Sequence, residues 1–142
     1  MLIDDRLLID EILVGLPGRR PTGPLSTTSY WYYRACRASV AGGAGHLSGP
    51  FAALPLGQRG DAIHRLLALP DHIDLPEPRQ LVPVMAELAR RHDRLNLLNL
   101  EAVAAASIAD ATVWLSSPAA AGVLPAVLES EGIRWREVRL PA

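Results

Sequence analysis

The chain begins with MLIDDRLLIDEIL, residues 1–13, and this stretch decides how the remaining sequence is interpreted. A short apolar run, residues 1–3, meets two carboxylates, Asp4 and Asp5. The leucines and isoleucines that follow are spaced four and five residues apart, which is typical of an amphipathic helix. We expect a strand that passes directly into a helix. Its acids either cap that helix or lie at the carboxyl end of the strand, where α/β folds place their sites.

The same alternation of strand and helix patterns continues along the chain. Further strands are expected at 25–29, 72–75, 112–115 and 133–138. Helices are expected within 30–38, 62–69, 81–92, 101–109 and 123–129. Residues 17–24 and the glycine-rich residues 41–50 are expected to form loops. About five strands and five or six helices in alternation predict one domain, residues 1–142. Its fold is a three-layer α/β/α arrangement with a mostly parallel five-stranded sheet.

Composition excludes several classes of protein. Among the 142 residues, 49% are apolar and 20% charged, which is a globular composition. The sequence contains no lysine, so a Walker A lysine, a Schiff base and a pyridoxal-phosphate site are excluded. Cys36 is the single cysteine, so an internal disulfide or a cysteine-based zinc cluster is excluded as well. Acids near the start of the chain and the lack of a long apolar run predict a cytoplasmic protein that does not bind membranes.

Charge is distributed unevenly although the net charge is −1. No carboxylate occurs from residue 12 to residue 60, where the chain carries five arginines and a run of four aromatic side chains. Arginines beside aromatic residues are typical of proteins that hold single-stranded nucleic acid. The candidate RNA-binding residues are Arg19, Arg20, Tyr30, Arg34 and Arg37. In the alternative interpretation, the aromatic side chains anchor a helix in the core and the arginines are merely solvated.

Other kinds of active site find little support. The four histidines have no HxH or HExxH spacing, and the sequence lacks the GxSxG motif of serine hydrolases. A small-molecule enzyme on a flavodoxin-like sheet remains an alternative that rests on fold analogy alone.

Two segments resemble a known family. The strand MLID followed at once by the helix DRLLIDEILVGL resembles the opening of a PIN domain, the fold of VapC-type toxins. LVPVMAELARRHDRLNLLNLEAVAAASIADATVWLSS, residues 81–117, resembles the later half of that family. There a helix and a short loop precede an acid, an alanine-rich helix and a strand that ends in Thr or Ser. The resemblance implies a metal-dependent ribonuclease fold over nearly the whole chain.

The family's acidic site is only partly represented. Asp4 matches the acid that ends the first strand, and Glu101 stands at or near the acid of the alanine-rich helix, with Asn99 as the alternative alignment. The resemblance therefore implies Asp4 and Glu101 as catalytic residues, with Asp4, Asp5, Asn99 and Glu101 around Mg²⁺ or Mn²⁺. The acid of the second or third helix has no counterpart, and Ser116 stands in the segment where the late acid is expected.

These observations together predict a PIN-like, RNA-binding domain that is at most a weak Mg²⁺-dependent endoribonuclease. The alternative is a non-catalytic protein-interaction or regulatory module that uses the segment from Tyr30 to Arg37. Expected partners are single-stranded RNA, or a protein such as an antitoxin or a second copy of the chain.

Overall fold

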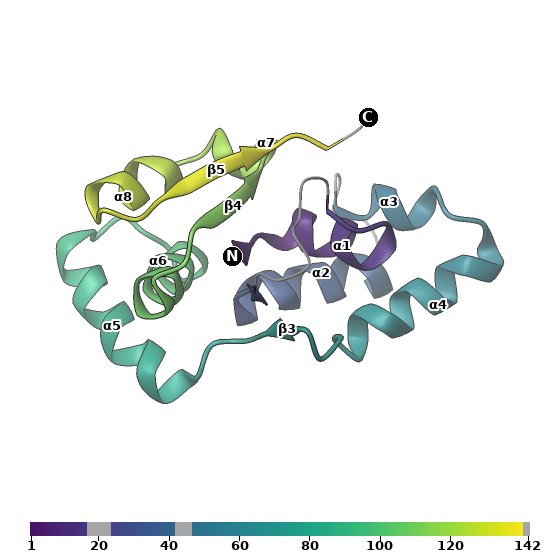
Figure 1. Ribbon diagram of the computed structural model, residues 1–142, viewed down its shortest axis with the longest axis horizontal. Helices are drawn as coiled ribbons and strands as arrows, with labels where there is room; N and C mark the ends of the chain where they lie inside the picture. The colour runs from purple at the N-terminus through teal and green to yellow at the C-terminus, as the bar shows by residue number, and fades with distance from the viewer. Residues whose placement is uncertain (17–23, 42–46, 141–142) are drawn as a thin grey trace.

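A five-stranded parallel sheet forms the centre of the molecule, in the order β3-β2-β1-β4-β5 (Figure 1). The computed structural model describes residues 1–16, 24–41 and 47–140. The strands are β1 (Leu2–Ile3), β2 (Leu25–Ser26), β3 (Ile73–Asp74), β4 (Val113–Ser116) and β5 (Trp135–Val138). Because β2 and β4 flank β1 on opposite sides, the direction of winding changes between β1 and β4. This arrangement confirms the predicted α/β fold class.

Helices cover both faces of this sheet (Figure 1). One side carries α1 (Asp5–Leu13), α2 (Ser29–Ala41), α3 (Gly49–Ala52) and α4 (Leu56–Leu67). The other side carries α5 (Pro78–Arg91), α6 (Leu97–Ala109) and α8 (Leu124–Ser130), while α7 (Ser117–Ala120) follows β4 directly. In the part of the chain that the structure describes, no helix is long and apolar enough to cross a membrane.

Alternating side chains of the strands supply two apolar cores. Ile3 and Trp114 pack into the core with α1, whereas Leu2, Val113 and Leu115 pack into the core with α6. Residues 102–106 of α6, four alanines and Val103, are buried, whereas Ala109 at the end of the helix is exposed. Small side chains let α6 lie close to the sheet.

The helices are longer and more numerous than predicted. The helices α4 and α6 begin at Leu56 and Leu97, six and four residues before the expected starts at 62 and 101. An N-cap explains the second case, because the Asn96 side chain accepts a hydrogen bond from the Asn99 N–H at 2.9 Å. The short helix α3 begins inside residues 41–50, which were expected to form a loop, and α7 lies in a segment for which no helix was predicted; the described helices number eight.

Pro83 lies inside α5, beyond its first turn. Its ring nitrogen cannot donate the usual helical hydrogen bond. The residue is exposed, so water can bind the carbonyl group that loses its partner.

Candidate functional site

A cavity of about 360 Å³ opens at the carboxyl ends of β1 and β4. Asp5 and Ser116 line it from the ends of these strands, and Arg34 and Asn99 line it from α2 and α6. In doubly wound sheets, ligands bind in the crevice where the winding direction changes. The location of the cavity makes it the candidate functional site.

Asp4 is fully buried and connects three elements through its hydrogen bonds, one of whose partners, Ser116, lines the cavity. Its Oδ1 accepts a hydrogen bond from the Leu7 N–H at 2.9 Å and thereby caps α1. Its Oδ2 accepts hydrogen bonds from the N–H and the hydroxyl of Ser116, at 2.8 and 2.6 Å. Burial, and then the neighbouring carboxylate of Asp5, raise the pKa of Asp4 to about 6, while these hydrogen bonds oppose the rise.

Glu101 is also buried, and its carboxylate caps α2. Its two oxygens accept hydrogen bonds from the backbone N–H groups of Ser29 and Tyr30, both at 2.9 Å. The positive end of the helix dipole favours a carboxylate at this position. Thr28 caps the same helix through a hydrogen bond from the Trp31 N–H to its hydroxyl oxygen.

These contacts do not fit the metal ion that the resemblance implies. Mg²⁺ and Mn²⁺ need several oxygen ligands with free lone pairs. The Asp4 Oδ2 accepts two hydrogen bonds, and the other Asp4 oxygen and both Glu101 oxygens accept one each, so few lone pairs are left for a metal ion. Neither Asp4 nor Glu101 lines the cavity. Among the described residues, no group of three or more His, Cys, Asp or Glu could hold a metal ion. The catalytic and metal-binding roles of Asp4 and Glu101 stay predictions.

Asp5 is the carboxylate that lines the cavity. Its Oδ1 accepts a hydrogen bond from the Arg6 N–H at 2.8 Å. Its Oδ2 is buried and has no hydrogen-bond donor, although the Arg34 Nε lies 3.3 Å away as an ion-pair partner. Burial raises the pKa of Asp5, and the Arg34 guanidinium opposes that rise. A buried carboxylate oxygen without a donor is costly, and it favours a ligand that supplies one.

The exposed face of α2 borders this cavity through Arg34. The side chains of Tyr30, Tyr33 and Arg34 are 40, 59 and 44% exposed, and Arg37 one turn further along is exposed too. Trp31 is 3% exposed and packs in the core. The expected core role therefore holds for Trp31, and Tyr32 is half-buried against the core with its hydroxyl donating to backbone carbonyl groups of α4. The other two tyrosines and two arginines share the outer face. Arg19 and Arg20 lie outside the described residues.

Sequence reasoning missed the far wall of the cavity. Ala119, Val123 and Leu124 line it from α7 and the start of α8. Their apolar side chains carry no chemical signal of their own. Their place in the sequence is a usable signal, since the segment after β4 must begin at the carboxyl edge of the sheet.

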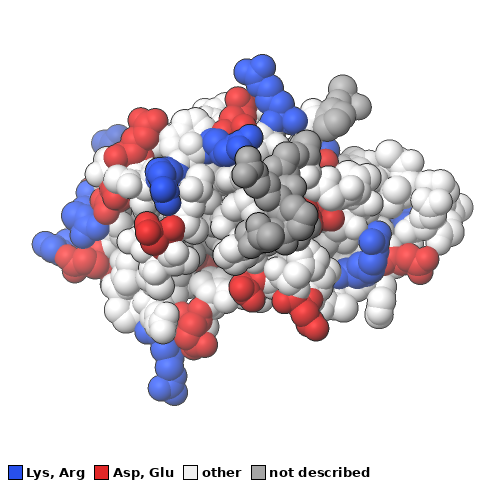
Figure 2. Space-filling model, viewed as in Figure 1, with Lys and Arg blue, Asp and Glu red and all other residues white. Residues whose placement is uncertain are grey.

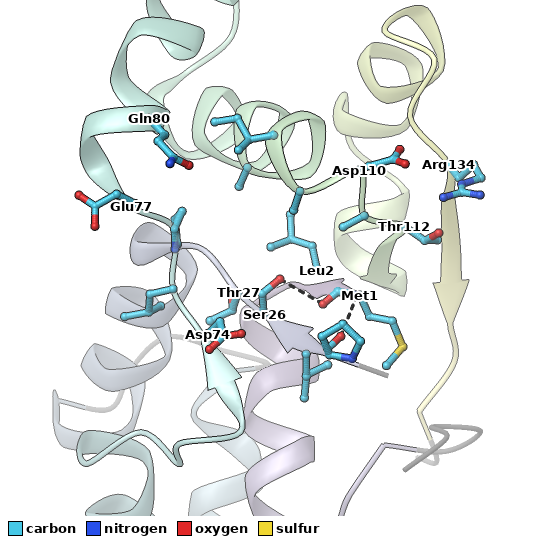
Figure 3. A pocket seen from close by; sticks show the side chains of 18 residues that line it. Met1, Leu2, Ser26, Thr27, Asp74, Glu77, Gln80, Asp110, Thr112 and Arg134 are labelled. Carbon is cyan, nitrogen blue, oxygen red and sulfur yellow. Dashed lines mark hydrogen bonds between the residues drawn. The ribbon is translucent and has the colours of Figure 1, made fainter. Parts of the chain in front are cut away.

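A second, larger cavity of about 640 Å³ lies beside the amino ends of β1 and β4. Figure 3 shows Leu2 in its middle, with Glu77 and Gln80 on one side and Asp110 and Arg134 on the other. The three carboxylates that line it, Asp74, Glu77 and Asp110, are exposed. Among the described residues, the buried oxygen without a hydrogen-bond donor belongs to Asp5 of the smaller cavity. The smaller cavity is therefore the stronger candidate.

No protein-family model matches the chain, and no curated protein or solved structure matches it either. The fold and the cavity define a class of protein: a doubly wound α/β domain. Its cavity, lined in part by polar side chains, lies where the direction of winding changes. Membership of the PIN family stays a prediction from the two sequence segments.

Proposed function

We propose that this chain is a PIN-like domain that binds single-stranded RNA through α2 and has little or no ribonuclease activity. The observation that carries the proposal is the exposed stripe of Tyr30, Tyr33, Arg34 and Arg37. Their spacing of three and four residues brings them onto one face of the helix. Such a stripe offers aromatic rings for base stacking and guanidinium groups for phosphates.

RNA binding requires a local group of positive side chains, because the net charge of the molecule gives no overall attraction to RNA. The net charge is −1, and acidic and basic side chains are interspersed over the face shown in Figure 2. Within the described residues, Arg37 makes no ion pair, and Arg34 pairs only with Asp5. Both guanidinium groups are therefore accessible to phosphates, while most other exposed arginines lie on other elements.

The test is fluorescence anisotropy with labelled single-stranded RNA over a series of salt concentrations. We expect weak, salt-sensitive binding that the double variant Arg34→Ala/Arg37→Ala removes. Any binding that the variant retains should have a slope of log affinity against log salt smaller by about 1.4, because two phosphate contacts are lost. The matched control is Arg79→Ala/Arg94→Ala, which removes two exposed arginines from outside α2. Equal weakening by both double variants would contradict the proposal.

The second candidate function is a non-catalytic protein-interaction module on the same helix. Val40 is 63% exposed near the end of the stripe, and aromatic and arginine side chains are enriched at protein interfaces. The candidate partners are an antitoxin or a second copy of the chain. This function predicts no RNA binding at low salt and a partner whose binding depends on Tyr33 and Val40.

A further inference from the structure

Among the described residues that line the cavity at β1 and β4, one carries a carboxylate, Asp5, and one carries a guanidinium, Arg34. The Asp5 Oδ2 is buried and lacks a hydrogen-bond donor, and the Arg34 Nε lies 3.3 Å from it. A phosphate inside the cavity would compete with Asp5 for this guanidinium and would lie close to the Asp5 carboxylate, in surroundings where charges are poorly screened. A base with hydrogen-bond donors faces no such repulsion.

We propose that the cavity takes one base of the bound strand, and that Asp5 selects a base with an amino group on its pairing edge. Adenine and cytosine carry this group at C6 and C4, and guanine carries one at C2, whereas uracil has no amino group and presents a carbonyl oxygen at C4. This inference rests on the proposed RNA binding by α2 and assigns a specificity to the adjoining cavity.

The walls and size of the cavity suit a base. Its volume of about 360 Å³ falls within the range of small-molecule pockets, roughly 300–1,000 Å³. Trp31, Leu98 and Leu124 supply apolar surface for the faces of a ring. Asn99 lines the same cavity, and its side-chain amide can donate to the ring nitrogen beside the amino group.

Arg34 links the cavity to the stripe on α2. In the free protein its Nε lies 3.3 Å from the Asp5 Oδ2, while 44% of the side chain is exposed. The Asp5 side chain is 7% exposed, so the guanidinium can leave only when another hydrogen-bond donor takes its place at the Asp5 oxygen. When the strand binds, the guanidinium transfers to a backbone phosphate, and the Asp5 oxygen accepts the hydrogen bond of the amino group instead.

The experiment compares labelled octacytidine with octauridine by fluorescence anisotropy at one low salt concentration. These strands carry the same charge and differ at the pairing edge of the base. For the natural sequence we expect about tenfold tighter binding of octacytidine, as for a hydrogen bond to a charged group. Asp5→Asn should bring the two affinities within about twofold, because an amide can also donate to the uracil carbonyl. Asp10→Asn removes an equal charge from α1 and should keep the preference.

A second variant, Ala119→Phe, fills the cavity and leaves Asp5 in place. It should remove the preference for octacytidine while α2 still binds both strands. Equal affinities of the natural sequence for both strands would overturn the base site and leave RNA binding intact. Failure of both strands to bind at low salt would overturn the proposed function and the base site together. A preference that survives in Ala119→Phe would also overturn the assignment to this cavity.

Discussion

Two neighbouring carboxylates, Asp4 and Asp5, have different roles because their surroundings differ. Asp4 accepts three hydrogen bonds from Leu7 and Ser116, so it joins β1, α1 and β4. Asp5, one residue further along α1, has an oxygen without a donor and lines the cavity. The first side chain is therefore structural, and the second is available to a ligand.

Asp4 should make the stability of the protein depend on pH. Burial raises its pKa in the folded state from an ordinary 3.8 to about 6, so the folded state binds a proton that the unfolded state releases between these values. One pKa unit corresponds to about 1.4 kcal/mol, so the free energy of unfolding should fall by about 2 kcal/mol from pH 4 to pH 6 and by about 3 kcal/mol over a range that extends well beyond both pKa values. Urea denaturation at several pH values measures this fall.

Asp4→Asn is the variant that isolates this effect. The fall in unfolding free energy between pH 4 and pH 6 should be smaller in this variant. Part of the fall should remain, because burial also raises the pKa values of Asp5 and Asp10. The variant should also be less stable near pH 7, because an amide group cannot accept all three hydrogen bonds. If the unfolding free energies of the two proteins changed with pH in parallel, the pH dependence would come from groups other than Asp4.

At the scale of elements, α2 depends on a carboxylate from α6. Glu101 satisfies the N–H groups of Ser29 and Tyr30 at the start of the helix. The same first turn carries Tyr30, which belongs to the exposed stripe. The contact therefore couples the core packing of α6 to the surface that we propose binds RNA.

Replacing Glu101 should loosen this end of α2. Glu101→Gln directs an amide N–H₂ at one of the two backbone donors, which should cost about 1–2 kcal/mol of unfolding free energy. RNA binding should weaken with it, as the first turn of α2 frays. Thermal denaturation and the RNA titration measure the two effects. The control Glu87→Gln changes an exposed carboxylate on α5, and a loss of stability as large as that of Glu101→Gln would contradict a capping role.

At the scale of the whole molecule, the fold places a cavity where α/β enzymes hold their ligands, but its carboxylates are arranged for other contacts. Asp4 and Glu101 are each held by two or more backbone or hydroxyl donors. A metal ion at either carboxylate would have to share oxygens that already cap a helix. This arrangement is the reason that we predict binding rather than hydrolysis.

We accordingly expect little or no cleavage of RNA by the purified protein. The assay is gel electrophoresis of structured and unstructured RNA incubated with Mg²⁺ or Mn²⁺. Added Mn²⁺ at millimolar concentration should leave the melting temperature of the protein unchanged, and the same should hold for Asp4→Asn. Robust cleavage that Asp4→Asn abolishes would restore the metal-dependent ribonuclease.

The sequence by itself determined the order of strands and helices and the parallel α/β class. Apolar periodicity and helix-capping side chains such as that of Thr28 act over a few residues. The secondary structure that they favour can therefore be predicted from short stretches of sequence. The ends of the helices were predicted less accurately, because the first residues of α4 and α6 lie outside the strongest apolar pattern. The sequence also showed that residues 12–60 contain five arginines and no carboxylate.

Only the tertiary structure decided what the candidate site residues do. Glu101 meets α2 across 72 positions of sequence, and Ser116 meets Asp4 across 112. Such contacts depend on how the layers pack, because a carboxylate can cap a helix, bind a metal or face a cavity with no change in the local pattern. The donor-free oxygen of Asp5 likewise follows from burial between α1, α2 and β4, which no short segment of the sequence encodes.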